Sequence, residues 1–221
     1  MVDKFLEFQT INIAVVGDFN PTIFQPFWLS SKNLIREDEA KSANVELIHN
    51  DIVRFNLDWV SFEITRNRFD VRCTKEPYFD PVKDLTVGIF KILHETPIRT
   101  LGINHIFELA LQNEKYFYNF GKNLAILDLW EPSLNKPKLN YFEVIENERG
   151  DGKKGSRRVR LRSAPERTFG VTLDINNHFN IDNKISEESL VNLIGSNWQG
   201  SLESGHTILA NLFEKNKFYN E

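Results

Sequence analysis

Alternation of apolar and polar residues predicts most of the strands in this chain. Residues 10–18, TINIAVVGD, are β-branched and apolar enough for a buried strand. Further short apolar-rich runs follow between residues 45 and 74. In residues 60–65 and 69–74, apolar side chains occupy every second position on either side of a polar turn at residues 66–67. This period predicts an antiparallel hairpin with one buried and one solvated face.

Proline and capping residues predict where the helices of the first half begin and end. Asn20-Pro21 is typical of a helix start, but Pro26 lies too deep for the first turn, so we expect a short, kinked or restarted helix. Asp80-Pro81 predicts the start of a longer helix, and Pro97 predicts its end. The inward stripe of this longer helix comprises Val82, Leu85, Ile89, Ile92 and Leu93.

The second half repeats this order of elements. One face of a long strand is lined by Ile103, His105, Phe107, Leu109 and Leu111. A short aromatic helix is expected over residues 114–120, and strands are expected over 138–148, 157–163 and 167–179. Ser186-Glu187-Glu188 predicts the start of the last helix through its cap and first-turn charge. Three glycines weaken this helix, and a break is expected near Gly205.

These elements predict an α+β fold. The predicted architecture has antiparallel sheet(s) from two strand–helix–three-strand–helix halves, with the long helices packed on one face. The halves are residues 1–97 and 98–221, and together they form one compact pseudo-repeat domain. They do not match residue for residue, so either a structural duplication or a chance succession of common elements explains the order. At the level of architecture only, tandem halves of this order resemble the TATA-binding-protein and helix-grip folds.

Composition adds constraints on packing and on cellular compartment. Eighteen phenylalanines against one methionine indicate that rigid rings carry much of the packing. No apolar run approaches the roughly 18 residues of a membrane span, and the start MVDKFLEFQT lacks the features of a secretory signal. A lone cysteine, Cys73, cannot form an intrachain disulfide. We therefore expect a cytoplasmic protein that makes no contact with membranes.

Positive charge gathers in one predicted hairpin. Residues 149–167 contain eight basic and two acidic residues, a net charge of +6, whereas the whole chain carries −4. The acidic remainder disfavours wholesale coating of nucleic acid but permits one local anion contact. The candidate anion- or nucleic-acid-binding residues are Lys153, Lys154, Arg157, Arg158, Arg160 and Arg162.

Two interpretations of this hairpin remain open. Arg158, Arg160 and Arg162 alternate with apolar residues and are expected on one face, where neighbouring guanidinium groups could grip phosphate or carboxylate groups. The alternative is that a solvated strand face needs charge for solubility, or that basic side chains protect an exposed edge.

Other candidate residues do not converge on one chemistry. Asp174, Asn176 and His178 share one face of a regular strand, so they could ligate a metal or act in acid–base chemistry, but polar residues before a turn give the same pattern. Cys73 and His105 fall on apolar faces, where a buried thiol and a core histidine are expected. The sequence contains no Walker loop, dinucleotide fingerprint, nucleophile elbow, zinc pair or HExxH motif. No catalytic residue, metal site or cofactor is predicted.

Several segments resemble those of a family of uncharacterised bacterial proteins of similar length. The segments are GDFNPTIFQPFWL (17–29), DWVSFEITRNRF (58–69), TPIRTLGINHIF (96–107) and the late LDINNHF. The resemblance covers most of the chain and implies a bacterial or phage context. It implies no catalytic residue.

An aromatic-rich chain without a catalytic motif favours a binding function. The leading hypothesis is a non-enzymatic protein-binding or assembly subunit of a bacterial multi-component system, such as a defence system, acting through a protein partner or self-association. One alternative is binding of nucleic acid or another polyanion through the basic hairpin at residues 149–167. A further alternative is a small-molecule binder or enzyme with a pocket between the sheet and the long helices.

Overall fold

The computed structural model describes residues 4–164, 167–181 and 189–218. The elements of the first half are β1 (Leu6–Gly17), η2 (Pro21–Ile23), α1 (Pro26–Ser31), α2 (Glu37–Ser42), β2 (Asn44–His49), β3 (Ile52–Asn56), β4 (Ser61–Thr65), β5 (Arg68–Cys73), η3 (Glu76–Tyr78) and α3 (Phe79–Ile92). The elements of the second half are β6 (Ile98–Ala110), α4 (Glu114–Leu124), η4 (Leu127–Leu129), β7 (Tyr141–Glu146), β8 (Gly155–Ala164), β9 (Gly170–Asn180) and α5 (Ser189–Asn216).

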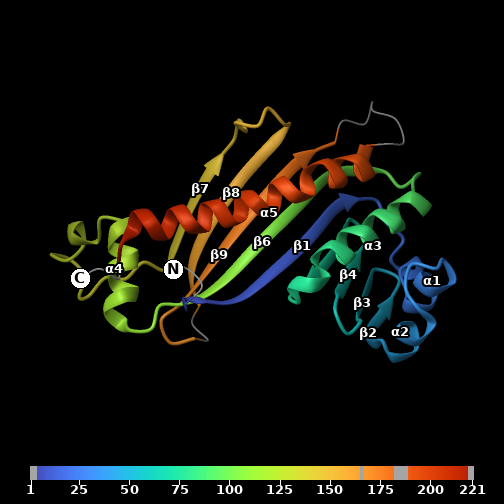
Figure 1. Ribbon diagram of the computed structural model, residues 1–221, viewed down its shortest axis with the longest axis horizontal. Helices are drawn as coiled ribbons and strands as arrows, with labels where there is room; N and C mark the ends of the chain where they lie inside the picture. The colour runs from blue at the N-terminus through green and yellow to red at the C-terminus, as the bar shows by residue number, and fades with distance from the viewer. Residues whose placement is uncertain (1–3, 165–166, 182–188, 219–221) are drawn as a thin grey trace.

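The nine strands of the described residues form one antiparallel sheet, in the order β2-β3-β4-β5-β1-β6-β9-β8-β7 (Figure 1). β1 pairs with β6, so the sheet runs without a break from one half into the other. In each half the first strand pairs with the last, β1 with β5 and β6 with β9. The α+β class and the antiparallel sheet are thus confirmed, whereas an internal duplication stays a prediction.

The first half contains one strand more than predicted between its helices. Four strands, β2 to β5, stand where three were expected, and the second half has the expected three. β2 and β3 correspond to the two short apolar-rich runs VELIH and IVRFNL, and they pair around the turn that Asn50-Asp51 predicts, so the local pattern indicated both strands although the count of three did not. All six residues of this edge strand are exposed, so β2 lacks the alternation of burial that β3 and β4 show.

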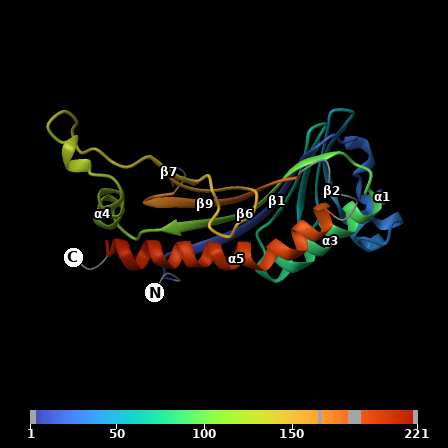
Figure 2. The ribbon, with the colours of Figure 1, turned by 90° about the horizontal axis from the view of Figure 1, so that it is seen from above.

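The long helices lie on one side of the sheet and leave the other side uncovered (Figure 2). α5 packs on β6 and β9, and it contacts α3, which packs on β5. α1 and α2 lie at one end of the molecule, and α4 lies at the other (Figure 1). We call the uncovered side the open face. It carries Asn12, Asn104 and Asn176, which alternate along their strands with buried core residues.

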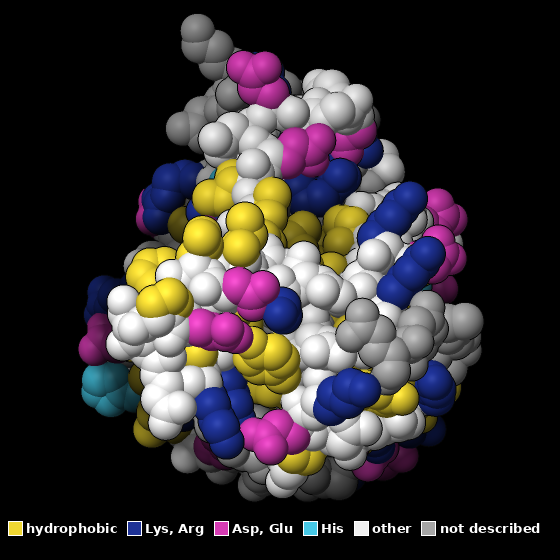
Figure 3. Space-filling model, turned by 90° about the vertical axis from the view of Figure 1, so that its left-hand side faces the viewer, with side chains coloured by type: hydrophobic (Ala, Val, Ile, Leu, Met, Phe, Trp, Pro, Cys, Tyr) yellow, Lys and Arg dark blue, Asp and Glu magenta, His cyan; other side chains and the backbone are white. Residues whose placement is uncertain are grey.

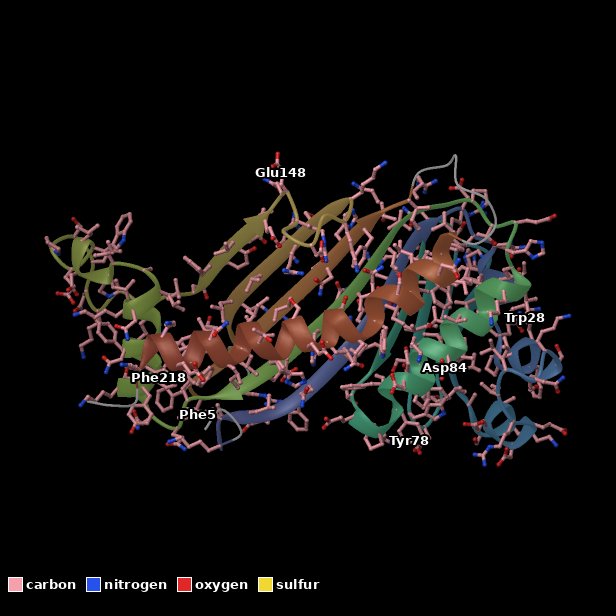
Figure 4. The ribbon with its side chains drawn as sticks, turned by 45° about the horizontal axis from the view of Figure 1, so that its top comes forward. Phe5, Trp28, Tyr78, Asp84, Glu148 and Phe218 are labelled. Atoms are coloured by element: carbon pink, nitrogen blue, oxygen red, sulfur yellow. The ribbon has the colours of Figure 1, made fainter. Side chains whose placement is uncertain are left out.

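Phenylalanine rings fill much of the core beneath the helices. In a first cluster the centre of the Phe69 ring lies 5.4 Å from that of Phe24 and 5.1 Å from that of Phe90. In a second cluster, at the end of α5, the Phe5 and Phe218 rings lie 5.4 Å apart (Figure 4). Core packing by rigid rings follows the prediction from composition.

Two predicted helix starts differ in outcome. The chain forms one turn of 3₁₀-helix at Pro21–Ile23, and α1 begins anew at Pro26, so the predicted restart is confirmed. α3 begins at Phe79, and Asp80 is a first-turn residue and not the predicted cap. The Asp80 carboxylate instead accepts a hydrogen bond from Trp198 Nε1 at 2.7 Å. Asp80 thus contacts α5 and does not cap its own helix.

α5 continues to Asn216 without the break predicted near Gly205, and its predicted start at residues 186–188 lies outside the described residues. A β-carbon at Gly205 would lie 2.6 Å from His105 Nδ1, whereas one at Gly195 would meet nothing within 4 Å. Gly205 therefore permits the close approach of α5 to β6. No helix in the described part of the chain combines the length and the apolarity needed to cross a membrane.

We expect Gly205→Ala to lower the free energy of unfolding by about 1 kcal/mol. Alanine gains about 1 kcal/mol of helix propensity over glycine. Its β-carbon would displace the packed His105 ring, and overpacking of a core costs roughly 1–3 kcal/mol. Gly195→Ala is the matched control and is expected to raise stability by about 1 kcal/mol. Urea denaturation measures both, and equal stabilisation by the two variants would contradict the close approach at Gly205.

Candidate functional site

The predicted basic hairpin at residues 149–167 includes β8 and most of the connection that joins β8 to β7, and Glu148 stands at the outer end of this connection (Figure 4). β8 also pairs with β9, so its successive side chains lie on opposite sides of the sheet. Arg158, Arg160 and Arg162 lie on the open face, while the intervening Leu161 joins the core. The predicted alternation of this strand is confirmed.

The remaining basic residues of the hairpin do not extend this row. Arg157 lies on the helix side, where its Nε donates to Asn177 Oδ1 at 2.9 Å and its Nη1 lies 3.2 Å from Glu146 Oε2. Lys153 Nζ donates to Asn197 Oδ1 of α5. The Lys153 contact attaches the hairpin to α5, whereas those of Arg157 join β8 to β9 and β7. The six candidate anion-binding residues, which also include exposed Lys154, are therefore divided between two sides of the sheet.

Arg149 stabilises the base of the hairpin. This residue is buried, and its Nε and Nη2 donate to the two carboxylate oxygens of Asp151 at 3.0 and 2.5 Å. Its guanidinium group also lies 4.5 Å from the centre of the Phe179 ring. The hydrogen bond from Arg149 lowers the pKa of Asp151 to about 2. This arginine therefore holds the fold locally and is not available to a ligand.

Carboxylates neutralise much of the arginine row on the open face. Arg160 Nε donates to Glu143 Oε2 at 2.6 Å, and its Nη1 lies 3.6 Å from Asp174 Oδ2. Burial raises the pKa of Asp174, against the influence of the nearby guanidinium groups. Arg158 Nε lies 3.7 Å from Glu143 Oε1, whereas Arg162 has no hydrogen bond or ion pair with any described residue. Anion binding by this hairpin stays a prediction.

The second candidate group does not form one site. Asp174, Asn176 and His178 share the open face, as predicted. Their contacts diverge, since Asp174 faces β8, Asn176 donates to Asn104 Oδ1, and His178 Nε2 lies 3.2 Å from Asn180 Oδ1. In the described ranges no group of three or more His, Cys, Asp or Glu residues could hold a metal ion.

The two residues expected in the core are both buried. Cys73 is 1% exposed, and burial raises the pKa of its thiol, which is the opposite of what a nucleophile needs. His105 is 2% exposed, its Nε2 lies 3.1 Å from Gln9 Oε1, and its ring centre lies 4.0 Å from that of Phe107. The predicted core histidine with a polar neighbour is confirmed.

Sequence reasoning missed a polar row that crosses the open face. Asn12 of β1, Asn104 of β6 and Asn176 of β9 are cross-strand neighbours, and Arg72 of β5 and Arg158 of β8 stand at the two ends of the row. Asn176 Nδ2 donates to Asn104 Oδ1, and Asn104 Nδ2 donates to Asn12 Oδ1 at 2.6 Å. The available signal was a lone asparagine within apolar segments such as INIAVV and GINHIF.

Exposed apolar side chains form a second unexpected feature, at the α4 end of the molecule. The exposed fractions are 69% for Ile126, 71% for Leu129, 56% for Trp130 and 52% for Leu134. Figure 3 faces this end, and hydrophobic side chains gather on it. We call these four residues the end patch. The sequence signal was the run ILDLW, four apolar residues out of five, which lies between the helix expected over residues 114–120 and the strand expected from residue 138.

Polar groups border the end patch. Lys122 Nζ lies 2.8 Å from Asp128 Oδ1, and Tyr118 Oη donates to Glu131 Oε1 at 2.8 Å. Beside them opens a hollow of about 810 Å³, lined by residues of α4 and of the segment 131–138. An apolar centre with a polar rim is the usual composition of a protein-binding surface.

No family model matches this chain, and no curated protein matches it. The open face and the end patch are therefore interpreted from their own geometry and charge. Of the two, the end patch has the larger apolar exposure, and the open face has the denser set of hydrogen-bonding groups.

Proposed function

We propose that this chain is a non-enzymatic protein-binding or assembly subunit and that the end patch is its contact surface. The observation that carries the proposal is the exposure of four large apolar side chains at one end. Removing apolar surface from water contributes roughly 25 cal/mol per Å², so a partner that covers the end patch gains affinity. Trp130 belongs to the residue type that most often dominates the binding energy of an interface.

The partner is a protein surface or a second copy of this chain. Apolar side chains with a polar rim suit either, and the setting proposed from the resemblance is a bacterial multi-component system. At the rim, the charges of Lys122 and Asp128 compensate each other in an ion pair. Covering the adjacent apolar side chains therefore costs less desolvation free energy than it would beside an unpaired charge.

Replacing both Leu129 and Trp130 by serine is expected to weaken partner binding or self-association at least tenfold. Two of the four large apolar side chains of the end patch would be lost, and truncation of an interface residue that dominates binding commonly costs more than 1 kcal/mol. Size-exclusion chromatography with light scattering measures self-association, and affinity capture from the native host measures binding of another protein.

Phe27→Ser is the matched control, because Phe27 is 63% exposed but belongs to α1 at the other end of the molecule. This variant is expected to behave like the wild type. A wild-type chain that stays monomeric and captures no partner would contradict the proposal, as would equal loss of binding in both variants.

A further inference from the structure

A polar hollow on the open face lies among β3, β4 and β5. These strands lie near the α1 end of the molecule, far from α4 and the end patch (Figure 1). Its volume is about 380 Å³, within the range of small-ligand sites. The charged and hydroxyl side chains that line it are Arg54, Ser61, Glu63, Arg68, Asp70 and Arg72. All of them belong to strands, so a rigid scaffold holds the lining.

Two of the three arginines are held in place by carboxylates. Arg54 Nε and Nη2 contact Glu63 Oε2 at 2.8 and 2.6 Å. Arg68 Nε and Nη2 donate to Asp70 Oδ2 at 2.9 and 2.6 Å, and Asn12 Nδ2 donates to the other oxygen of Asp70 at 2.5 Å. These contacts fix both guanidinium groups before any ligand arrives.

Arg72 is the exception among the three. Its side chain has no hydrogen bond or ion pair with any residue that the structure describes. The strand register places it between Ser61 of β4 and Asn12 of β1, and the Ser61 hydroxyl also lacks a hydrogen bond within the described ranges. Three guanidinium groups and two carboxylates leave the lining with a net charge of +1.

We propose that this hollow binds a carboxylate through Arg72, with the Ser61 hydroxyl as a second donor. The planar fork of arginine matches a carboxylate in two parallel hydrogen bonds. One negative charge balances the lining, whereas a doubly charged phosphate would also meet Glu63 and Asp70. The same chemistry is presented by a small organic acid and by an acidic side chain of a protein.

A nucleic acid is the less favoured occupant. Residues 1–97 contain 11 basic and 15 acidic residues, so this half carries a net charge of −4 and repels a polyanion. The site is independent of the end patch, because the two lie in different halves of the chain. Failure of either proposal therefore leaves the other standing.

Titration of ¹⁵N-labelled protein with sodium acetate at constant ionic strength tests the site. We expect saturable shifts of the backbone amide signals of Ser61 and Arg68. Arg72→Ala is expected to weaken acetate binding at least tenfold. Arg66→Ala removes the same charge from the β4–β5 turn, where Arg66 pairs with Asp51 outside the hollow, and is expected to leave the affinity unchanged.

Two further titrations identify the source of the carboxylate. Tighter binding of a blocked glutamate peptide than of acetate would support a protein ligand, and the reverse order would support a small acid. Tighter binding of dimethyl phosphate than of both would overturn the proposal, since this probe represents a phosphodiester. Identical, non-saturating shifts with sodium chloride, or unchanged affinity in Arg72→Ala, would also overturn it.

Discussion

Replacing Trp198 by alanine is expected to lower the free energy of unfolding by about 3–5 kcal/mol. Trp198 of α5 is 2% exposed and belongs to the core cluster where α5 meets α3. Its indole Nε1 donates to Asp80 Oδ1 at 2.7 Å. Truncation removes the transfer free energy of the ring and leaves a cavity that two packed helices only partly close. For a chain of this length, such a loss lowers the midpoint temperature of thermal unfolding by about 10 °C.

Two control variants separate the contribution of packing to stability from that of the hydrogen bond, and compare a buried tryptophan with an exposed one. Trp198→Phe keeps an aromatic ring but loses the bond to Asp80, so we expect a cost of about 1–2 kcal/mol. Trp130→Ala is expected to change stability by less than about 0.5 kcal/mol, because Trp130 is 56% exposed. Urea denaturation measures the stability of all three variants, and an unchanged m-value shows that a shift of the midpoint reports stability alone. A loss below about 1 kcal/mol for Trp198→Ala would contradict a central role of this side chain.

Local periodicity predicted the strands because burial in a sheet alternates with every residue. Ile103 and Phe107 lie on the buried face of β6, as the apolar pattern required, and the arginines of β8 lie on the opposite face. Period alone does not identify the neighbouring strands. Glu143 and Asp174, which neutralise Arg160, come from β7 and β9, and only the register of the sheet brings them together.

Long-range contacts explain the features that sequence reasoning missed. Asn12 and Asn104 are 92 residues apart and bond only because β1 pairs with β6 across the two halves. The unpaired state of Arg72 depends in the same way on its neighbours in β4 and β1. Helix propensity alone predicted a break at Gly205, and the contact with His105 overrides it.

Lowering the pH from 7 to 5 is expected to reduce the free energy of unfolding by about 2 kcal/mol through His105. Burial, and then the nearby His206, lower the pKa of His105 from 6.5 to about 3. Its ring centre lies 4.0 Å from that of Phe107 and 5.0 Å from that of His206, so a charged imidazole would have little solvent. In the unfolded chain His105 has its ordinary pKa, so at pH 5 it binds a proton that it does not bind in the folded chain.

The sign of the effect follows from this difference. The contribution of neutral His105 is fully present above pH 6.5 and falls by up to about 1.4 kcal/mol for each pH unit between 6.5 and 3. His105→Phe removes the titrating group, so its stability is expected to stay nearly constant between pH 7 and 5. His94→Gln changes an exposed histidine after α3 and is expected to keep the wild-type slope.

Comparison with His105→Phe separates the histidine from other titrating groups, which include Asp174, whose carboxyl pKa is raised by burial. The pKa of Asp151 is lowered to about 2 from 3.8, so the stability that Asp151 provides is lost only below pH 4. The difference between the wild type and His105→Phe in urea denaturation at pH 7, 6 and 5 therefore reports on the imidazole. Equal pH dependence in the wild type and in His105→Phe would show that another group controls acid stability. A flat profile in the variant alone would identify the contact between α5 and β6 as the acid-sensitive part of the core.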